Sequence, residues 1–155
     1  MGEITVDEIL KVAIEKEVEA QCFYRSLAER TENKTTKTAL EALAQWEQFH
    51  KEQLEQYKLG EIKEGTLEAS EVVDYKIVEK LKQPQITSEM PLEDAFILAA
   101  EREMASHDFY IAFAAMHPEG KARILLEELA MQEISHKHRV EFLYAETAFP
   151  QTDGG

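Results

Sequence analysis

The sequence predicts an all-α protein, a four-helix bundle made of two repeated helix hairpins that are joined by a long crossover. Four segments carry apolar residues at the 3.6-residue spacing of an amphipathic helix. The last two segments repeat residues of the first two at an offset of 86 positions, which pairs Glu47 with Glu133. Between the two pairs lies a polar stretch, residues 60–90, which is longer than neighbouring antiparallel helices need. A connection of this length suits a crossover between parallel helices.

Length and charge restrict the class of protein. The 155 residues suffice for one domain with a single core. The formal net charge is −14, with 31 acidic and 17 basic residues, so we expect no nucleic-acid partner. No uncharged apolar run approaches the ~20 residues of a membrane span, so we expect no membrane insertion.

The start of the chain and its cysteine content predict a cytoplasmic location. The first residues are acidic and lack the basic and apolar regions of a signal peptide. Cys22, the single cysteine, cannot form an intrachain disulfide, which favours a reducing compartment. We expect Cys22 to be a small buried residue of the first helix.

The first hairpin is expected over residues 5–59. Thr5 and Glu8 have the spacing of a capping box, which marks the start of a helix. A polar turn at residues 32–35 separates the two helices, and Gly60 ends the second. Glu17 interrupts the apolar stripe of the first helix. A carboxylate at a core position usually marks a site, because burying it costs free energy.

The second hairpin is expected over residues 91–147. Pro91 suits the first turn of its first helix. The segment from His117 to Gly120 turns the chain, and His117 is interpreted as a residue at the start of the last helix.

Three further predictions concern the remaining segments. The crossover, residues 60–90, is expected to contain one short helix at about 72–81. Residues 148–155 are expected to be a flexible tail. Residues 1–147 are expected to form the single folded domain.

Each hairpin carries one Glu-x-x-His motif on its second helix, and this repeat is the strongest indication of function. The motifs are Glu47 with His50 and Glu133 with His136. A three-residue step leaves both side chains on one face of a helix, where they can share a metal ion. Packing alone explains a repeat of apolar positions but gives no reason to repeat Glu and His among them.

Two more glutamates, Glu17 and Glu103, belong to the repeat. In an antiparallel helix pair, residues equidistant from the turn lie side by side, so all four glutamates are expected at one level near mid-bundle. Four carboxylates and two imidazoles in an apolar core need cations, and two divalent ions offset four negative charges. The predicted metal ligands are Glu17, Glu47, His50, Glu103, Glu133 and His136.

The ligand types narrow the choice of metal. A Glu from each of two helices and Glu-x-x-His from each of the other two is the ligand set of di-iron and di-manganese carboxylate bundles. Glu and His together favour iron or manganese over calcium, which prefers oxygen ligands alone. We expect two iron ions, with manganese or zinc as alternatives.

Some neighbouring residues have more than one interpretation. Tyr24 follows Glu17 by seven residues, and Tyr110 follows Glu103 by seven, in each case on the same face of the helix. They are interpreted either as core aromatics or as residues that hold the ligands or take part in redox chemistry. Trp46 is interpreted as a packing residue. His107 is a rival ligand that the repeat does not support.

These motifs resemble the rubrerythrin branch of the ferritin-like superfamily of di-iron carboxylate proteins, over residues 5–147. The resemblance implies a ferritin-like bundle, with Glu47 and Glu133 as bridging carboxylates and Glu17 and Glu103 as terminal ones. It implies one histidine on each metal. It also implies that a di-iron centre reduces hydrogen peroxide or oxygen, with Fe(II) supplying the electrons.

Two departures from that family bear on function. Rubrerythrins usually end in a rubredoxin domain with paired Cys-x-x-Cys motifs, whereas this chain has a single cysteine. Electrons are therefore expected from a separate donor, such as a rubredoxin-like protein. Ser106 stands where the family has an extra glutamate that lets iron change ligands. Without that extra glutamate, the set of six ligands resembles that of bacterioferritin as much as that of rubrerythrins.

Three functional classes stay open. The preferred one is an oxidoreductase that reduces peroxide or oxygen. The second is an iron-handling protein with ferroxidase activity, and the third is a module with structural metals or a partner-binding role. We expect a homodimer, in which the long crossover would permit an exchange of helix pairs.

Overall fold

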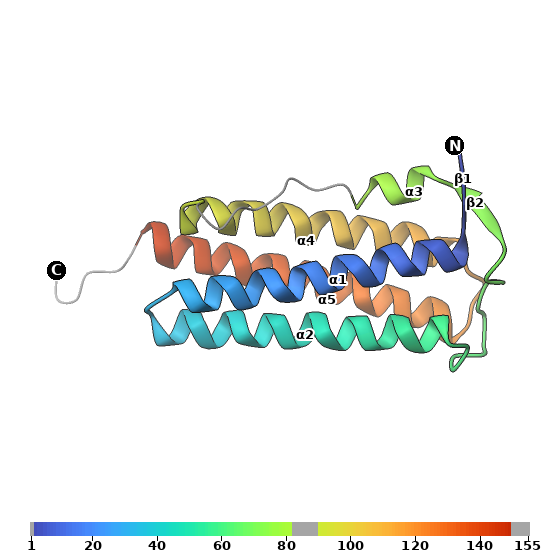
Figure 1. Ribbon diagram of the computed structural model, residues 1–155, viewed down its shortest axis with the longest axis horizontal. Helices are drawn as coiled ribbons and strands as arrows, with labels where there is room; N and C mark the ends of the chain where they lie inside the picture. Colours follow the sequence, from blue (N-terminus) through green and yellow to red (C-terminus); the bar gives the residue numbers. More distant parts are fainter. Residues whose placement is uncertain (1, 82–89, 150–155) are drawn as a thin grey trace.

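The four long helices begin and end close to the capping and turn residues of the sequence. In the computed structural model, which describes residues 2–81 and 90–149, they form two hairpins (Figure 1). The first hairpin is α1 (Val6–Arg30) with α2 (Lys34–Lys58), and the second is α4 (Leu92–Ala115) with α5 (Lys121–Ala148). The prediction of an all-α four-helix bundle is confirmed.

Side-chain caps start the first two helices. Thr5 accepts a hydrogen bond from the backbone N–H of Glu8 at 3.1 Å, and its hydroxyl donates to Glu8 Oε1 at 2.9 Å. Asn33 accepts from the backbone N–H of Thr36 at 3.0 Å. Each cap satisfies one of the backbone N–H groups that a helix start leaves without an intrahelical partner.

Within the crossover, a short strand stands where the sequence predicts the start of a helix. Strand β1 (Glu3–Thr5) pairs antiparallel with β2 (Val72–Asp74), and only α3 (Lys76–Glu79) is helical within the expected range of 72–81. The first part of that helix prediction is therefore wrong. The β-branched residues Val72 and Val73 find a partner strand immediately before α1, and pairing outweighs helix formation there.

The end of the bundle near the α4–α5 turn holds a buried polar network. His117 lies in this turn and is buried, so the interpretation that it starts the last helix is wrong. Its Nδ1 is 2.8 Å from the carbonyl oxygen of Phe113, and its Nε2 is 2.7 Å from Tyr57 Oη. The backbone N–H of Leu67 donates to the same hydroxyl at 3.0 Å. The network thus joins α2, the crossover and the turn.

Hydrogen bonds across the bundle fix the helix directions. Tyr24 on α1 contacts Glu103 on α4, and Tyr110 contacts Glu17, so α1 and α4 are antiparallel. Each hairpin is antiparallel by construction, so α2 and α4 are parallel, and the chain crosses the length of the bundle between them (Figure 1). The expected crossover is present, although its residues 82–89 and residues 150–155 of the expected tail lie outside the described residues.

The core consists of two apolar clusters with a polar layer between them. One cluster contains the start of α1, the end of α4 and the first half of α5. The other contains the end of α1, the start of α4 and the end of α5. The repeated Glu and His residues occupy the level between the clusters on every long helix.

Two surface features complete the fold. Cys22 is exposed, not buried as predicted, because two residues of helix place it on the face opposite Tyr24. Among the described residues, no helix combines the length and apolarity that a membrane span needs.

Candidate metal centre

The six residues that the sequence singles out meet at mid-bundle. Each lies on the inward stripe of its helix, so helix periodicity turns it toward the core. None is more than 6% exposed. The residues are Glu17 on α1, Glu47 and His50 on α2, Glu103 on α4, and Glu133 and His136 on α5.

These residues form two overlapping groups that could each hold a metal ion. Glu47 and Glu133 belong to both groups. Glu17 and His50 complete one, whereas Glu103 and His136 complete the other, and in each group the ligand atoms lie within 4.8 Å of one another. Two ions would therefore share two carboxylates, and each would have one further carboxylate and one imidazole of its own.

The spacing of the donor atoms fits shared ions. His50 Nδ1 lies 2.9 Å from Glu133 Oε1 and 3.6 Å from Glu17 Oε2. His136 Nδ1 lies 3.7 Å both from Glu103 Oε2 and from Glu133 Oε1. Octahedral ligands at ~2.1 Å from an ion are ~3.0 Å apart at adjacent positions and ~4.2 Å apart across it. The measured distances fall mainly within this range.

Several donor atoms in the centre are buried and have no hydrogen-bond partner among the residues that the structure describes. They are Glu17 Oε2, Glu103 Oε2, Glu133 Oε1 and His50 Nδ1. The 2.9 Å approach of His50 to Glu133 lacks the geometry of a hydrogen bond, so both atoms count among them. An unpaired buried polar atom costs about 1–3 kcal/mol, and cations in the centre would contact all four. The residues therefore fit the metal ions that the ligand set implies.

The pKa shifts of the buried carboxyl groups also indicate that the centre fits cations. Burial, followed by the neighbouring carboxylates, raises the pKa of Glu47 and of Glu133 well above the usual range. Burial alone would also raise the pKa of Glu17, but hydrogen bonding by Glu47 and His50 outweighs it and lowers that pKa. Without cations, these shifts favour protons on the two shared glutamates. Divalent ions would replace those protons.

Two tyrosines hold the terminal glutamates from the opposite hairpin. Tyr24 Oη donates to Glu103 Oε1 at 2.5 Å, and Tyr110 Oη donates to Glu17 Oε1 at 2.6 Å. Burial first, and the bonded carboxylate next, raise the pKa of both hydroxyls well above 10.0, so both remain protonated donors. Of their two interpretations, the structure supports the role of holding the ligands.

The two histidines have different surroundings, which the sequence analysis missed. His50 Nε2 donates to Gln132 Oε1 at 2.6 Å, so Nδ1 is the ring nitrogen that is directed at the carboxylates and would bind a metal ion. The repeat pairs Gln132 with Trp46, which cannot accept a hydrogen bond. Trp46 is 45% exposed and packs against both imidazoles, with ring centroids 6.4 Å from His50 and 6.2 Å from His136. The repeat therefore aligns two unlike residues, Trp46 and Gln132, and this difference is the sequence signal that could have identified Gln132.

A small cavity adjoins the centre between α1 and α4. Its volume is about 10 Å³, close to the minimum that holds one water molecule. It reaches Glu17 and Glu103, and its other lining residues include Lys16, Arg102 and Ser106. Ser106 therefore lines a cavity that reaches both terminal glutamates.

The rival ligand His107 lies outside the centre. Its Nδ1 is 3.3 Å from Asp108 Oδ1, and it belongs to neither of the two ligand groups.

Comparison with known proteins places this centre in a familiar fold. A family model described as Rubrerythrin matches residues 8–144. A hypothetical protein from Pyrococcus furiosus is 23% identical, with a TM-score of 0.76 over 96% of this chain and 94% of that one. A protein from Thermotoga maritima, provisionally described as ferritin-like diiron-carboxylate, is 21% identical, with a TM-score of 0.75 over 95% of this chain and 99% of that one. A search of curated proteins gives no significant match.

Proposed function

Because the chain belongs to the rubrerythrin family, we propose that it holds two iron ions in this centre and reduces hydrogen peroxide or oxygen with electrons from a separate donor. The observation that carries the proposal is the pair of buried ligand groups that share Glu47 and Glu133. A single metal would leave one terminal glutamate and one histidine unused.

The metal ligands have distinct roles in this proposal. Glu47 and Glu133 would hold both ions, Glu17 and His50 would complete the ligands of one, and Glu103 and His136 those of the other. Two Fe(II) ions would supply the two electrons that reduce hydrogen peroxide to two water molecules. The substrate would be a small oxidant such as peroxide or oxygen, because the cavity beside the centre has room for little more than one water molecule.

The tyrosines orient the terminal carboxylates. Tyr24 and Tyr110 keep one oxygen of each terminal carboxylate occupied by a hydrogen bond, so the other oxygen faces the centre. Reduction of peroxide also consumes two protons. These protons would come from water that reaches the centre through the α1–α4 cavity, because the raised pKa of Tyr24 and of Tyr110 keeps both hydroxyls protonated.

One observation favours a second candidate, a protein that oxidises Fe(II) for storage or transfer. Ser106 lines the small cavity at the position where the extra glutamate of rubrerythrins is expected. A serine hydroxyl is a weak ligand for iron, so the iron positions would stay the same in both redox states. A centre with fixed positions suits Fe(II) oxidation as well as peroxide reduction.

Anaerobic Fe(II) titration followed by stopped-flow absorbance separates these functions. The proposed enzyme should bind about two Fe(II) per chain. It should then be oxidised faster by peroxide than by oxygen, and turn over peroxide when an electron donor is added. Faster oxidation by oxygen, with iron uptake that continues beyond the two sites, would identify the ferroxidase. No stoichiometric Fe(II) binding would overturn both.

A further inference from the structure

The cavity between α1 and α4 extends from the buried ligands to side chains that reach the surface. Glu17 and Glu103 form its inner wall, and each is 3% exposed. Lys16 and Arg102 belong to its outer wall, with side chains that are 29% and 14% exposed. A molecule that enters from this side must therefore pass two cations before it meets a terminal glutamate.

The sequence repeat relates these two cations to each other. Lys16 pairs with Arg102 at the offset of 86 residues, and each directly precedes a terminal glutamate. One carboxylate joins them, because Glu19 Oε2 lies 3.2 Å from Lys16 Nζ and 3.5 Å from Arg102 Nη2. The repeat pairs Glu19 with Ala105, so only α1 carries this acidic residue.

The side chain of Arg102 extends from α4 to α1. Its guanidinium carbon lies over the Phe23 ring, 5.6 Å from the ring centroid, and its Nη2 approaches Glu19, one turn before Phe23. Phe23 also lines the cavity, so the arginine spans the gap between the helices at the level of the cavity. Both contacts are weak, an exposed ion pair and a cation over an aromatic ring. The side chain can therefore move aside while the two helices stay in place.

We propose that Arg102 determines which oxidants reach the centre: its side chain covers the α1–α4 cavity, admits molecules of the size of hydrogen peroxide or oxygen, and excludes organic hydroperoxides. The covered cavity of about 10 Å³ has room for about one water molecule. Removal of the arginine side chain would open the space between Phe23 and Glu19 to solvent. The inference rests on the proposed function for the identity of the substrate, but access to the cavity can be measured without any metal.

A thiol placed inside the cavity measures this access. Ala99 lines the cavity and is 1% exposed, so the full chain with Cys22→Ser and Ala99→Cys carries one thiol, at the cavity wall. The metal-free chain is treated separately with methyl methanethiosulfonate and benzyl methanethiosulfonate. Both reagents are neutral, and in both reactions the thiolate forms a disulfide with the transferred group while methanesulfinate leaves. Mass spectrometry of the whole chain gives the two rates, and their ratio cancels the acidity of the thiol.

The exposed Cys22 of the unsubstituted chain gives the reference ratio for an open site. At position 99 the methyl reagent should be favoured by a further ~10-fold, the combined strength of one exposed ion pair and one cation–ring contact in holding the cover closed. Arg102→Ala should return the ratio close to the reference. Glu19→Ala should shift it in the same direction by a smaller factor, because Arg102 keeps its contact with Phe23.

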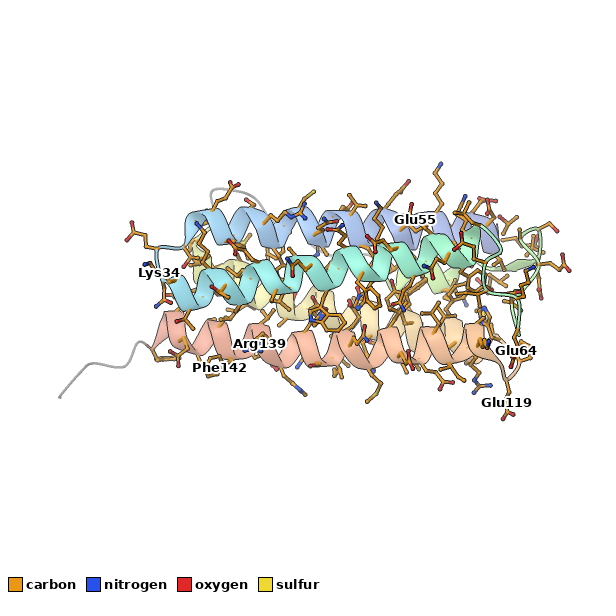
Figure 2. All side chains as sticks on the ribbon, turned by 90° about the horizontal axis from the view of Figure 1, so that it is seen from below. Lys34, Glu55, Glu64, Glu119, Arg139 and Phe142 are labelled. Carbon is orange, nitrogen blue, oxygen red and sulfur yellow. The ribbon has the colours of Figure 1, made fainter. Side chains whose placement is uncertain are left out.

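Arg139→Ala is the matched control. Figure 2 shows Arg139 on α5, and this exposed arginine is not among the residues that line the cavity. The variant should keep the ratio of the chain with Arg102. Circular dichroism first verifies the helix content of every variant.

The Fe(II)-loaded chain tests the consequence for the reaction. Stopped-flow absorbance gives the rates of oxidation by hydrogen peroxide and by cumene hydroperoxide. Arg102→Ala should raise the rate with cumene hydroperoxide ~10-fold relative to the rate with hydrogen peroxide, the same factor as in the thiol measurement. Arg139→Ala should leave the ratio of the two rates unchanged.

Three results would overturn the proposal. The first is a reagent ratio at position 99 that equals the Cys22 reference while Arg102 is present. The second is an unchanged ratio in Arg102→Ala. The third is no reaction of either reagent at position 99 in Arg102→Ala, because the cavity would then not be a route to the centre. Failure of the proposed function is a separate result, absent Fe(II) binding, which leaves the thiol measurement on the metal-free chain unaffected.

Discussion

Tyr110 on α4 donates a hydrogen bond to Glu17 on α1, with 2.6 Å between Oη and Oε1, although 93 residues separate them in the chain. Tyr24 on α1 makes the reciprocal bond to Glu103 on α4. Each hairpin therefore holds a terminal glutamate of the other hairpin. The pair of bonds joins the two halves of the repeat at the level of the centre, and it links ligand geometry to the packing of α1 against α4.

Tyr110→Phe should weaken Fe(II) binding in the group that contains Glu17. Loss of a hydrogen bond to a metal ligand typically costs about 10-fold in metal affinity or more. The variant keeps the ring and therefore the packing. Competition with a coloured chelator under anaerobic conditions measures the affinity of each site.

Tyr144→Phe is the matched control for this variant, because Tyr144 is partly buried on α5 away from the centre. Unchanged affinity in Tyr110→Phe would show that Glu17 needs no support from the opposite hairpin.

Substitution of a shared glutamate should lower the number of bound metal ions more than substitution of a terminal glutamate. Glu47→Gln removes a carboxylate from both groups, so binding should fall from about two Fe(II) per chain to below about one. Glu17→Gln removes a ligand from one group only, and about one Fe(II) should remain. Elemental analysis after gel filtration gives the ratio. Glu41→Gln, an exposed position on α2, should keep the wild-type ratio, and equal losses in the two centre variants would contradict the bridging role of Glu47.

The metal-free protein should lose stability as the pH rises above 6.5. The folded-state pKa of Glu47 and of Glu133 lies well above 4.5, because burial and neighbouring carboxylates raise it. For His50, Glu133 and Glu17 outweigh burial and raise the pKa well above 6.5. The folded chain thus holds protons that the unfolded chain has released, so its unfolding free energy falls with rising pH.

Thermal unfolding from pH 6.5 to about 8.5, with and without metal, measures this dependence. Bound metal replaces the protons, so the holo protein should show a flatter profile. Glu47→Gln should flatten the metal-free profile as well. A metal-free protein whose melting temperature rises over this range would contradict the predicted sign.

Tyr57→Phe should destabilise the end of the bundle that holds the crossover. Tyr57 and His117 are both buried, and the variant leaves His117 Nε2 and the N–H of Leu67 without their partner. An unsatisfied buried polar group costs about 1–3 kcal/mol in unfolding free energy. Urea denaturation measures the loss. Tyr75→Phe, at an exposed tyrosine of the crossover, should change stability by less than about 0.5 kcal/mol.

The fold class and the level of the centre could be predicted because both depend on local periodicity. On every long helix the buried positions recur at the helical period, and Glu17, Glu47, Glu103 and Glu133 fall on those positions. Equal distances from the two turns then place them side by side. The crossover followed from its length alone.

Features that depend on contacts between distant segments could not be predicted. Val72 and Val73 read as part of a helix until β1 offers a partner strand. His117 reads as a helix-start residue until Tyr57, 60 residues earlier, supplies its hydrogen bond. Neither partner is marked by any period in the sequence.

The sequence by itself determined which side chains face the core and at what height they lie, because helix geometry is set by neighbours along the chain. Only the tertiary structure decided which side chains meet across the bundle. In the tertiary structure, Glu17 accepts a hydrogen bond from Tyr110, His50 donates one to Gln132, and His136 lines a groove. Those pairings depend on how far each helix is rotated about its axis, and the packing of all four helices fixes that rotation.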